Sequence, residues 1–456
     1  MRRQRDNSEL LSGSILKHVF RLALPMIVAF MFVTSYHFID RYFVSQLGDV
    51  ATAAIGMAFI VQMVVIAIGV GVGSGVNSYI ARNLGAGDEE TAKSTVKHAF
   101  YLAAGIGTVL GIAGLILQKP LFRMLGAEGE LLELIVAYLT IIFIFTPVNL
   151  LAVVLNNVYQ GWGDTMSPMK FMLLGNFLNL IFDPLLIFGY GPFPELGIAG
   201  AGYATAIGRC AALLYLFYKL LIQHRPVQVS LTGFRPDRRI IRGIFQVGFP
   251  STLSQVLTSV AMGFVFWVLN PFGTDARTVY TIVFTYEMVV FLPAIGISQA
   301  VSILTGHNFG ARQLDRVNQT YGTGIAVAFG MMAVPAAIIF LSPHTFAGIF
   351  ARDPHVLELA ARALRITAAG FAFSSIYLCS VASFQGLGLG RQYLIANLMR
   401  LYFLQVPFTY FGAQLLQLDG VWGGLMAVNI ISALVLLIWH RYIFNYQILS
   451  GKIQPL

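Results

Sequence analysis

The sequence predicts an all-helical integral membrane protein in which twelve transmembrane helices form two six-helix bundles around a central cleft. Three observations lead to this prediction: the scarcity of charged residues, the length of the apolar runs, and a repeat that relates the two halves of the chain. Of the 456 residues, 57% are hydrophobic and 11% are charged, whereas soluble domains carry about 25% charged residues. So little polar surface cannot cover a water-facing protein, and the lipid bilayer must be its main solvent.

Twelve apolar runs are near or above the length of about 20 residues that a helix needs to cross a bilayer. Several are longer, which indicates tilted helices or helices that project beyond the lipid. The runs cover approximately residues 18–44, 52–81, 97–117, 131–159, 169–191, 197–222, 243–270, 278–305, 319–342, 357–386, 393–416 and 420–445.

The positive charges predict the orientation of the chain. Lysines and arginines gather in the N-terminal segment and in alternate loops, and the loop 223–242 alone holds five arginines. Such residues remain on the cytoplasmic side of membrane proteins. We therefore expect a multi-pass protein of the inner (plasma) membrane with both termini in the cytoplasm. The same distribution argues against nucleic acid as a partner, because the net charge of +9 forms neither a basic face nor a tail.

The long loop 223–242 separates an N-lobe, residues 1–222, from a C-lobe, residues 243–456, and the two lobes repeat. Because six crossings return the chain to the same side of the membrane, the repeat is parallel, and two bundles related in this way enclose a cleft. Three pairs of segments share an offset of 225 residues: Leu24-Pro25 with Phe249-Pro250, Asn83 to Ala86 with Asn308 to Ala311, and Gln160-Gly161 with Gln385-Gly386.

Three acidic residues, Asp40, Asp183 and Glu287, lie within the apolar runs. An ionised carboxylate at that depth is costly unless it pairs, meets water or takes up a proton, so intramembrane acids are usually functional. Asp40 and Asp183 both fall in the outward half of their runs and can face each other. Their counterparts in the second lobe are Val265 and Val406, so this acidic pair belongs to the N-lobe alone.

Two asparagines precede Asp183 in the fifth run, and Asn179 is one helical turn from it, whereas Asn176 is two turns away. His37 precedes Asp40 by three residues. It either tunes the carboxyl group of Asp40 or titrates itself and relays a proton to it, or it serves as an interfacial residue. Its place near the end of the run favours the interfacial interpretation.

Two further residues leave alternatives open. Pro25 removes a backbone hydrogen bond from the first run, which predicts a bend that is either a static kink or a moving hinge. Glu287 either contacts a cation or forms a polar anchor with Arg400 in the eleventh run.

Other chemistries are not indicated. The glycines from Gly69 to Gly75 alternate as in a phosphate-binding loop, but no Lys-Ser/Thr follows, so close helix packing is predicted. The chain has no Walker motif. Cys210 and Cys379 lie in apolar runs and predict neither a disulfide nor a metal site. We therefore expect a protein that is not an enzyme and that holds no cofactor.

Taken together, several motifs resemble those of the multidrug and toxic compound extrusion (MATE) family, and within it the DinF-like branch. The resemblance covers essentially the whole chain. It rests on Ala23-Leu24-Pro25, Ile39-Asp40, Gln46-Leu47-Gly48, Ala81-Arg82-Asn83-Leu84-Gly85-Ala86-Gly87, Gly163-Asp164-Thr165-Met166-Ser167-Pro168, Leu178-Asn179-Leu180-Ile181-Phe182-Asp183-Pro184 and Gly200-Ala201-Gly202-Tyr203-Ala204-Thr205.

The resemblance implies an exchanger of protons or sodium ions for organic cations and other drugs. It places a cation-coupling site on Asp40, Tyr138, Asn179, Asp183 and Thr205, with Asp40 as the principal residue. It further implies that protonation shifts the first helix near Pro25. In the NorM-like branch acidic residues of the seventh and tenth spans matter, but the matching places here hold Thr258 and Ser374 or Ser375.

We therefore predict a secondary active multidrug exporter that acts as a monomer and antiports small amphipathic, often cationic compounds. Its coupling ion is the proton, with Na⁺ at Asp40 and Asp183 as the alternative. A lipid-linked precursor flippase is a weaker alternative, because only Arg209 and Arg400 lie well within the runs to bind a diphosphate. A membrane enzyme would need clustered His and Asp residues, and this sequence shows no such cluster. We expect the drug to contact Asp40, Asn176, Asn179, Asp183, Met172 and Tyr36.

Overall fold

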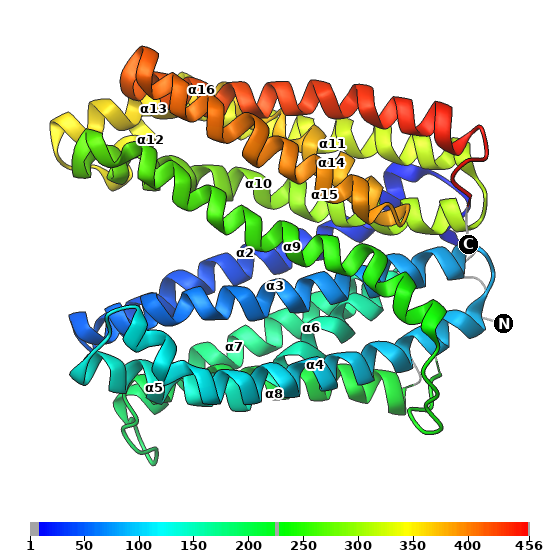
Figure 1. Ribbon diagram of the computed structural model, residues 1–456, viewed down its shortest axis with the longest axis horizontal. Helices are drawn as coiled ribbons and strands as arrows, with labels where there is room; N and C mark the ends of the chain where they lie inside the picture. Colours follow the sequence, from blue (N-terminus) through cyan, green and yellow to red (C-terminus); the bar gives the residue numbers. More distant parts are fainter. Residues whose placement is uncertain (1–8, 224–227, 455–456) are drawn as a thin grey trace. The chain divides into compact units, whose positions relative to one another are not determined.

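The computed structural model describes residues 9–223 and 228–454, apart from the side chains of residues 37, 38, 40 and 41 (Figure 1). Within these residues the chain is almost entirely helical. In a bilayer core this is required, because no water is present to satisfy free backbone groups. The α-helices are α2 (Ile15–Ser45), α3 (Asp49–Gly85), α4 (Glu89–Met124), α5 (Gly129–Ile144), α6 (Thr146–Gly161), α7 (Met166–Phe188), α8 (Ile198–Phe217), α9 (Arg238–Leu269), α10 (Gly273–Gly310), α11 (Leu314–Leu341), α12 (Pro343–Phe350), α13 (Pro354–Phe371), α14 (Ser374–Gly386), α15 (Gly390–Leu398) and α16 (Val406–Ile443). Shorter 3₁₀ or π segments are η1 (Tyr218–Ile222), η2 (Asn270–Phe272), η3 (Met399–Gln405) and η4 (Phe444–Ile448).

Eight stretches of the described chain are long and apolar enough to cross a membrane. Two bent helix pairs, α5–α6 and α13–α14, are also long and apolar enough when the two helices of each pair are taken together. Two of the eight stretches contain 73 and 59 residues. At about 1.5 Å per residue, a straight helix of either length would be far longer than the roughly 30 Å of a bilayer core. Each of these two stretches must therefore cross more than once.

Side-chain and main-chain contacts show where the two long stretches turn back. Phe266 of α9 and Tyr280 of α10 lie with their ring centroids 5.0 Å apart, which is possible only if α10 folds back along α9. In α16 the helical backbone is broken at Leu416 and Gln417, and Gln417 has a φ of 54°. A Cβ atom on Gly420 would overlap the main chain of Gly412, so the chain reverses there too. By length and composition the described residues contain eight to ten candidate spans, and the two reversals are consistent with the predicted twelve, which stays a prediction.

The internal repeat is visible in the helix bounds. α4 and α11 begin at Glu89 and Leu314, and α6 and α14 end at Gly161 and Gly386, in both cases 225 residues apart. The bend between α5 and α6 is 52°, and its counterpart between α13 and α14 is 44°. Both pairs were predicted as single runs. In the first pair the bend coincides with Pro147, which has no backbone N–H to continue the ladder.

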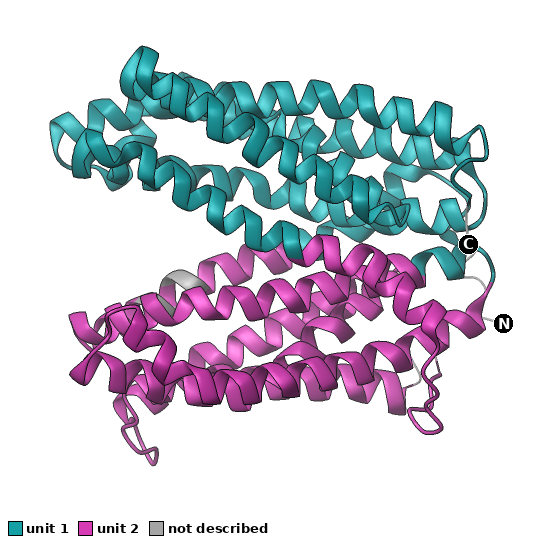
Figure 2. Ribbon diagram, viewed as in Figure 1, with its two compact units in different colours: residues 1–27, 81–87, 253–456 teal, residues 28–80, 88–252 magenta. Residues whose placement is uncertain are grey.

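Contacts between residues divide the chain into two compact units (Figure 2): unit 2 comprises residues 28–80 and 88–252, and unit 1 comprises residues 1–27, 81–87 and 253–456. Three of the boundaries fall inside helices: two residues after Pro25 in α2, between Ile80 and Ala81 in α3, and two residues after Pro250 in α9. These two prolines are repeat counterparts. The predicted lobe limits, residues 222 and 243, describe the duplicated segments and differ from the limits of these two units, so they stay a prediction.

Close packing of α3 in unit 2 explains its alternating glycines. A Cβ atom on Gly75 would overlap the carbonyl oxygen of Ile244 in α9, and one on Gly71 would overlap the Thr252 side chain. On another side, a Cβ on Gly73 would overlap the Asn157 amide of α6. The prediction that this run serves helix packing is confirmed.

Candidate functional site

One face of α7 in unit 2 carries three buried polar side chains. Asn176, Asn179 and Asp183 are 8%, 3% and 0% exposed, and their spacing of three and four residues places them along one side of the helix. The Asn179 Nδ2 donates a hydrogen bond to Asp183 Oδ1 at 3.0 Å, and the Asn176 Nδ2 donates to the Met172 carbonyl oxygen at 2.7 Å. The predicted grouping of these residues is thus observed for α7.

Helix α8 lies unusually close to this face of α7. A Cβ atom on Gly208 would overlap the Gly175 carbonyl oxygen and lie 3.3 Å from Asn179 Cβ. Further along, a Cβ on Gly200 would overlap the Leu186 carbonyl oxygen. Thr205 is half-buried on α8 between these two contacts. It therefore lies at the level of the polar face of α7.

The neighbouring helices add two polar groups. Tyr138 of α5 is 7% exposed and lies within a hydrophobic cluster, where its hydroxyl oxygen accepts a hydrogen bond from Gln62 Nε2 of α3 at 3.2 Å. Tyr36 of α2 is also buried and lies within electrostatic range of Arg209 on α8. Gln62 was not predicted as a site residue, although an amide inside the second apolar run is a signal that could have identified it.

The predicted partner of Asp183 cannot be placed. Asp40 and His37 belong to α2, but their side chains lie outside the described residues. The facing arrangement of Asp40 and Asp183 therefore stays a prediction. Pro25 is buried within α2, at the end of that helix which belongs to unit 1.

The alternative cation site in unit 1, around Glu287, lies near the positively charged Arg400. Arg400 donates a hydrogen bond to Asn429 Oδ1 at 2.8 Å, and its guanidinium lies 4.4 Å from the ring centroid of Tyr377. Its charge acts on Glu287 of α10, yet among described residues the ion pairs with N–O distances up to 4.0 Å do not include these two. Arg400 is thus held by neutral groups, and Glu287 is not its direct anchor.

The positions that match the acidic residues of the NorM-like branch carry hydroxyl groups, two of which donate to nearby main-chain carbonyls. The Thr258 hydroxyl donates to the Ser254 carbonyl at 2.8 Å, and the Ser375 hydroxyl donates to the Ala372 carbonyl at 2.6 Å. Ser374 is fully buried. Among the described residues no group of three or more His, Cys, Asp or Glu side chains could hold a metal ion.

The face of α7 offers one buried carboxyl group with a neighbouring amide. A carboxyl group at this depth can take up a proton. Carboxylate, amide and hydroxyl oxygens are also the hard ligands that small cations such as Na⁺ require, by analogy with other oxygen-coordinated ions. The described geometry is therefore compatible with either coupling ion.

Comparison with known proteins found similarities that extend over nearly the whole chain. The family model described as MatE matches the chain twice, over residues 25–185 and 250–411. A protein named "FAD transporter" from Shewanella oneidensis is 30% identical over 434 residues, which cover 94% of this chain and 95% of that relative. A multidrug export protein of Staphylococcus aureus is 28% identical and covers 93% of each chain. A solved outward-facing structure, of a multidrug resistance MATE family transporter of the MOP superfamily, superposes with a TM-score of 0.91 at 32% identity, covering 96% of this chain and 97% of that one.

Proposed function

Because the chain belongs to the MATE family of transporters, we propose that it is a secondary active exporter that expels small amphipathic, often cationic drugs in exchange for protons. The family assignment confirms that the protein is a multi-pass membrane transporter and not an enzyme. The DinF-like branch stays a prediction. No observation favours the lipid-linked precursor flippase over a MATE family exporter.

The buried carboxyl group of Asp183 is the observation that supports ion coupling most directly. It is fully buried and hydrogen-bonded to Asn179 on a helix whose repeat counterpart carries Val406. A polar group that served only packing would be expected in both copies of a duplicated bundle. An acid confined to one copy is better explained by a task that only that copy performs.

In the proposed cycle, Asp40 and Asp183 take up the coupling ion while Tyr138, Asn179 and Thr205 complete the polar surroundings. The drug contacts this region together with Asn176, Met172 and Tyr36. Ion uptake favours a different bend of α2 near Pro25, which releases the drug outward. A ligand can shift such an equilibrium only by binding one conformation more tightly than the other. The chain works as a monomer, and its loop charges support placing both termini in the cytoplasm.

Export of flavin adenine dinucleotide is a second candidate, because the Shewanella oneidensis relative, 30% identical, carries that cargo in its name. This cargo is anionic and much larger than most cationic drugs. The two candidates differ in the charge of the cargo, so a transport assay can separate them without any structural assumption.

The test is transport by the purified full-length protein in proteoliposomes. Efflux of a fluorescent organic cation should follow an imposed proton gradient in sodium-free buffer, and Asp40→Asn should abolish it. Efflux that requires sodium at constant pH would transfer the coupling role to Na⁺. Transport of flavin adenine dinucleotide but not of the organic cation would replace the drug with the dinucleotide as cargo.

A further inference from the structure

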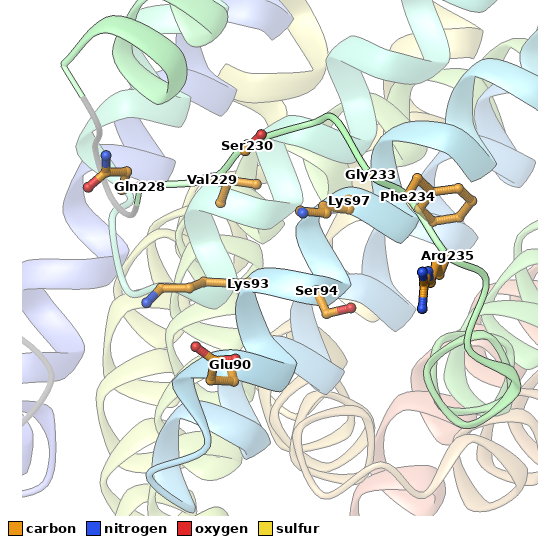
Figure 3. A pocket seen from close by; sticks show the side chains of 10 residues that line it. All are labelled: Glu90, Lys93, Ser94, Lys97, Gln228, Val229, Ser230, Gly233, Phe234 and Arg235. Atoms are coloured by element: carbon orange, nitrogen blue, oxygen red, sulfur yellow. The ribbon is translucent and has the colours of Figure 1, made fainter.

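A cavity of about 320 Å³ lies in unit 2 between the beginning of α4 and the connecting segment 228–235 (Figure 3). Its polar lining includes the cationic side chains Lys93, Lys97 and Arg235, and the neutral side chains Ser94, Gln228 and Ser230. Among the described residues, Glu90 is its single acidic lining residue. This cavity belongs to neither the α7 site nor any other group discussed above.

The connecting segment is fixed onto α4 by specific contacts. The Phe234 ring stacks on Tyr101 with centroids 4.2 Å apart and meets the His98 ring edge-on at 4.9 Å. The Tyr101 hydroxyl donates to the Leu231 carbonyl at 3.0 Å, and the Asp237 backbone N–H donates to His98 Nε2 at 2.8 Å. The cavity walls are therefore part of the fold.

The charges lining the cavity favour an anion. Lys97 Nζ donates one hydrogen bond, to the Thr232 carbonyl at 3.3 Å, and an ammonium group has three N–H donors. Lys93 pairs with Glu89 at 3.1 Å but stays 35% exposed, and Arg235 is exposed. Even with Glu89 counted against Lys93, three cations outnumber two carboxylates among the described residues at the cavity, so its net charge is positive. Cationic donors beside hydroxyl groups are the combination that binds phosphate oxygens in charge-assisted hydrogen bonds.

The position along α4 indicates where the anion comes from. The first turns of this helix are charged up to Lys97, and the next 21 residues, 98–118, contain no Asp, Glu, Lys or Arg. The cavity is thus located where the polar end of the helix meets its apolar part. In a membrane protein this is the depth of the lipid headgroups.

We propose that this cavity binds a phosphate group, supplied by the headgroup of an anionic phospholipid such as phosphatidylglycerol. Basic residues near the membrane surface bind anionic lipids through the same interaction. A bound headgroup would bridge α4 and the connecting segment, and would hold that segment against unit 2.

Native mass spectrometry of the full-length protein can test this proposal, with phosphatidylglycerol, phosphatidylcholine and glycerol 3-phosphate as probes. Lys97 is left unchanged because it also holds the segment. Each cation near a membrane surface contributes about 1 kcal/mol, or roughly a fivefold gain in affinity. Lys93→Gln combined with Arg235→Gln should therefore weaken phosphatidylglycerol binding about 25-fold. The matched control Arg239→Gln removes a cation from the same region that does not line the cavity, and should change binding less than about twofold.

A gain-of-affinity variant separates this effect from misfolding. Glu90→Gln removes the lining carboxylate and should strengthen phosphatidylglycerol binding about fivefold. Competition by glycerol 3-phosphate would support the phosphate site and identify a soluble phosphate ester as a second source. Equal binding of phosphatidylglycerol and phosphatidylcholine, or equal losses in the double variant and in Arg239→Gln, would overturn the proposal.

Discussion

Replacing Gly208 with alanine tests whether the close approach of α7 and α8 maintains the polar face. The added methyl group would overlap the carbonyl oxygen of Gly175, and it would lie 3.3 Å from the Cβ of Asn179. Because the nearest atom belongs to the main chain, no side-chain rotation can relieve the overlap. The two helices must separate, and the helix that carries Asn179 and Asp183 must move.

The expected cost combines two opposing effects. Overpacking typically costs about 1–3 kcal/mol, while alanine in a helix is more favourable than glycine by roughly 0.5–1 kcal/mol. The net loss is about 0–2.5 kcal/mol of unfolding free energy. For a unit of this size each kcal/mol corresponds to roughly 2–4 °C in Tm, so we expect a decrease of up to about 10 °C.

Thermal unfolding of the purified protein in detergent measures this effect, and transport in proteoliposomes measures its consequence for the site. The control is Gly105→Ala on α4, where a Cβ atom meets nothing within 4 Å. This control should unfold at or slightly above the wild-type temperature and transport normally. If Gly208→Ala matched Gly105→Ala in both measurements, the inferred packing of α8 on α7 would be wrong.

Two further predictions concern polar groups on other helices. At matched expression, Asp183→Asn should reduce drug transport more than Glu287→Gln does, because the buried acid of α7 is assigned to coupling; the reverse order would move the coupling site into the C-lobe. Tyr138→Phe should lower the unfolding free energy by about 1 kcal/mol, because it removes the acceptor of the Gln62 hydrogen bond. An unchanged Tm with unchanged transport would show that this bond contributes to neither.

Much of the fold follows from the sequence because lipid leaves the chain few choices. A long apolar run in a bilayer must be helical to satisfy its own backbone groups, so the runs predict most helix ends to within about five residues. The exception is α4, which begins eight residues before its run and ends seven residues after it. The predicted first run, 18–44, for example, is observed as Ile15–Ser45. The shared offset of 225 residues predicts the duplication, which reappears in the helix bounds. The contact of Asn179 with Asp183 was also predictable, because residues four apart on a helix are neighbours.

The long-range arrangement was decided only by the tertiary structure. Most of these helices are apolar on nearly all sides, so the sequence does not indicate which face of one helix packs on which neighbour. The pairing of Gln62 with Tyr138 joins residues 76 positions apart, and the docking of the connecting segment on His98 joins residues 139 apart. Such contacts depend on helix rotation and on small residues, such as Gly208, that let backbones approach. The sequence therefore determined which segments cross the membrane and where the buried acids occur, whereas packing determined which polar groups meet.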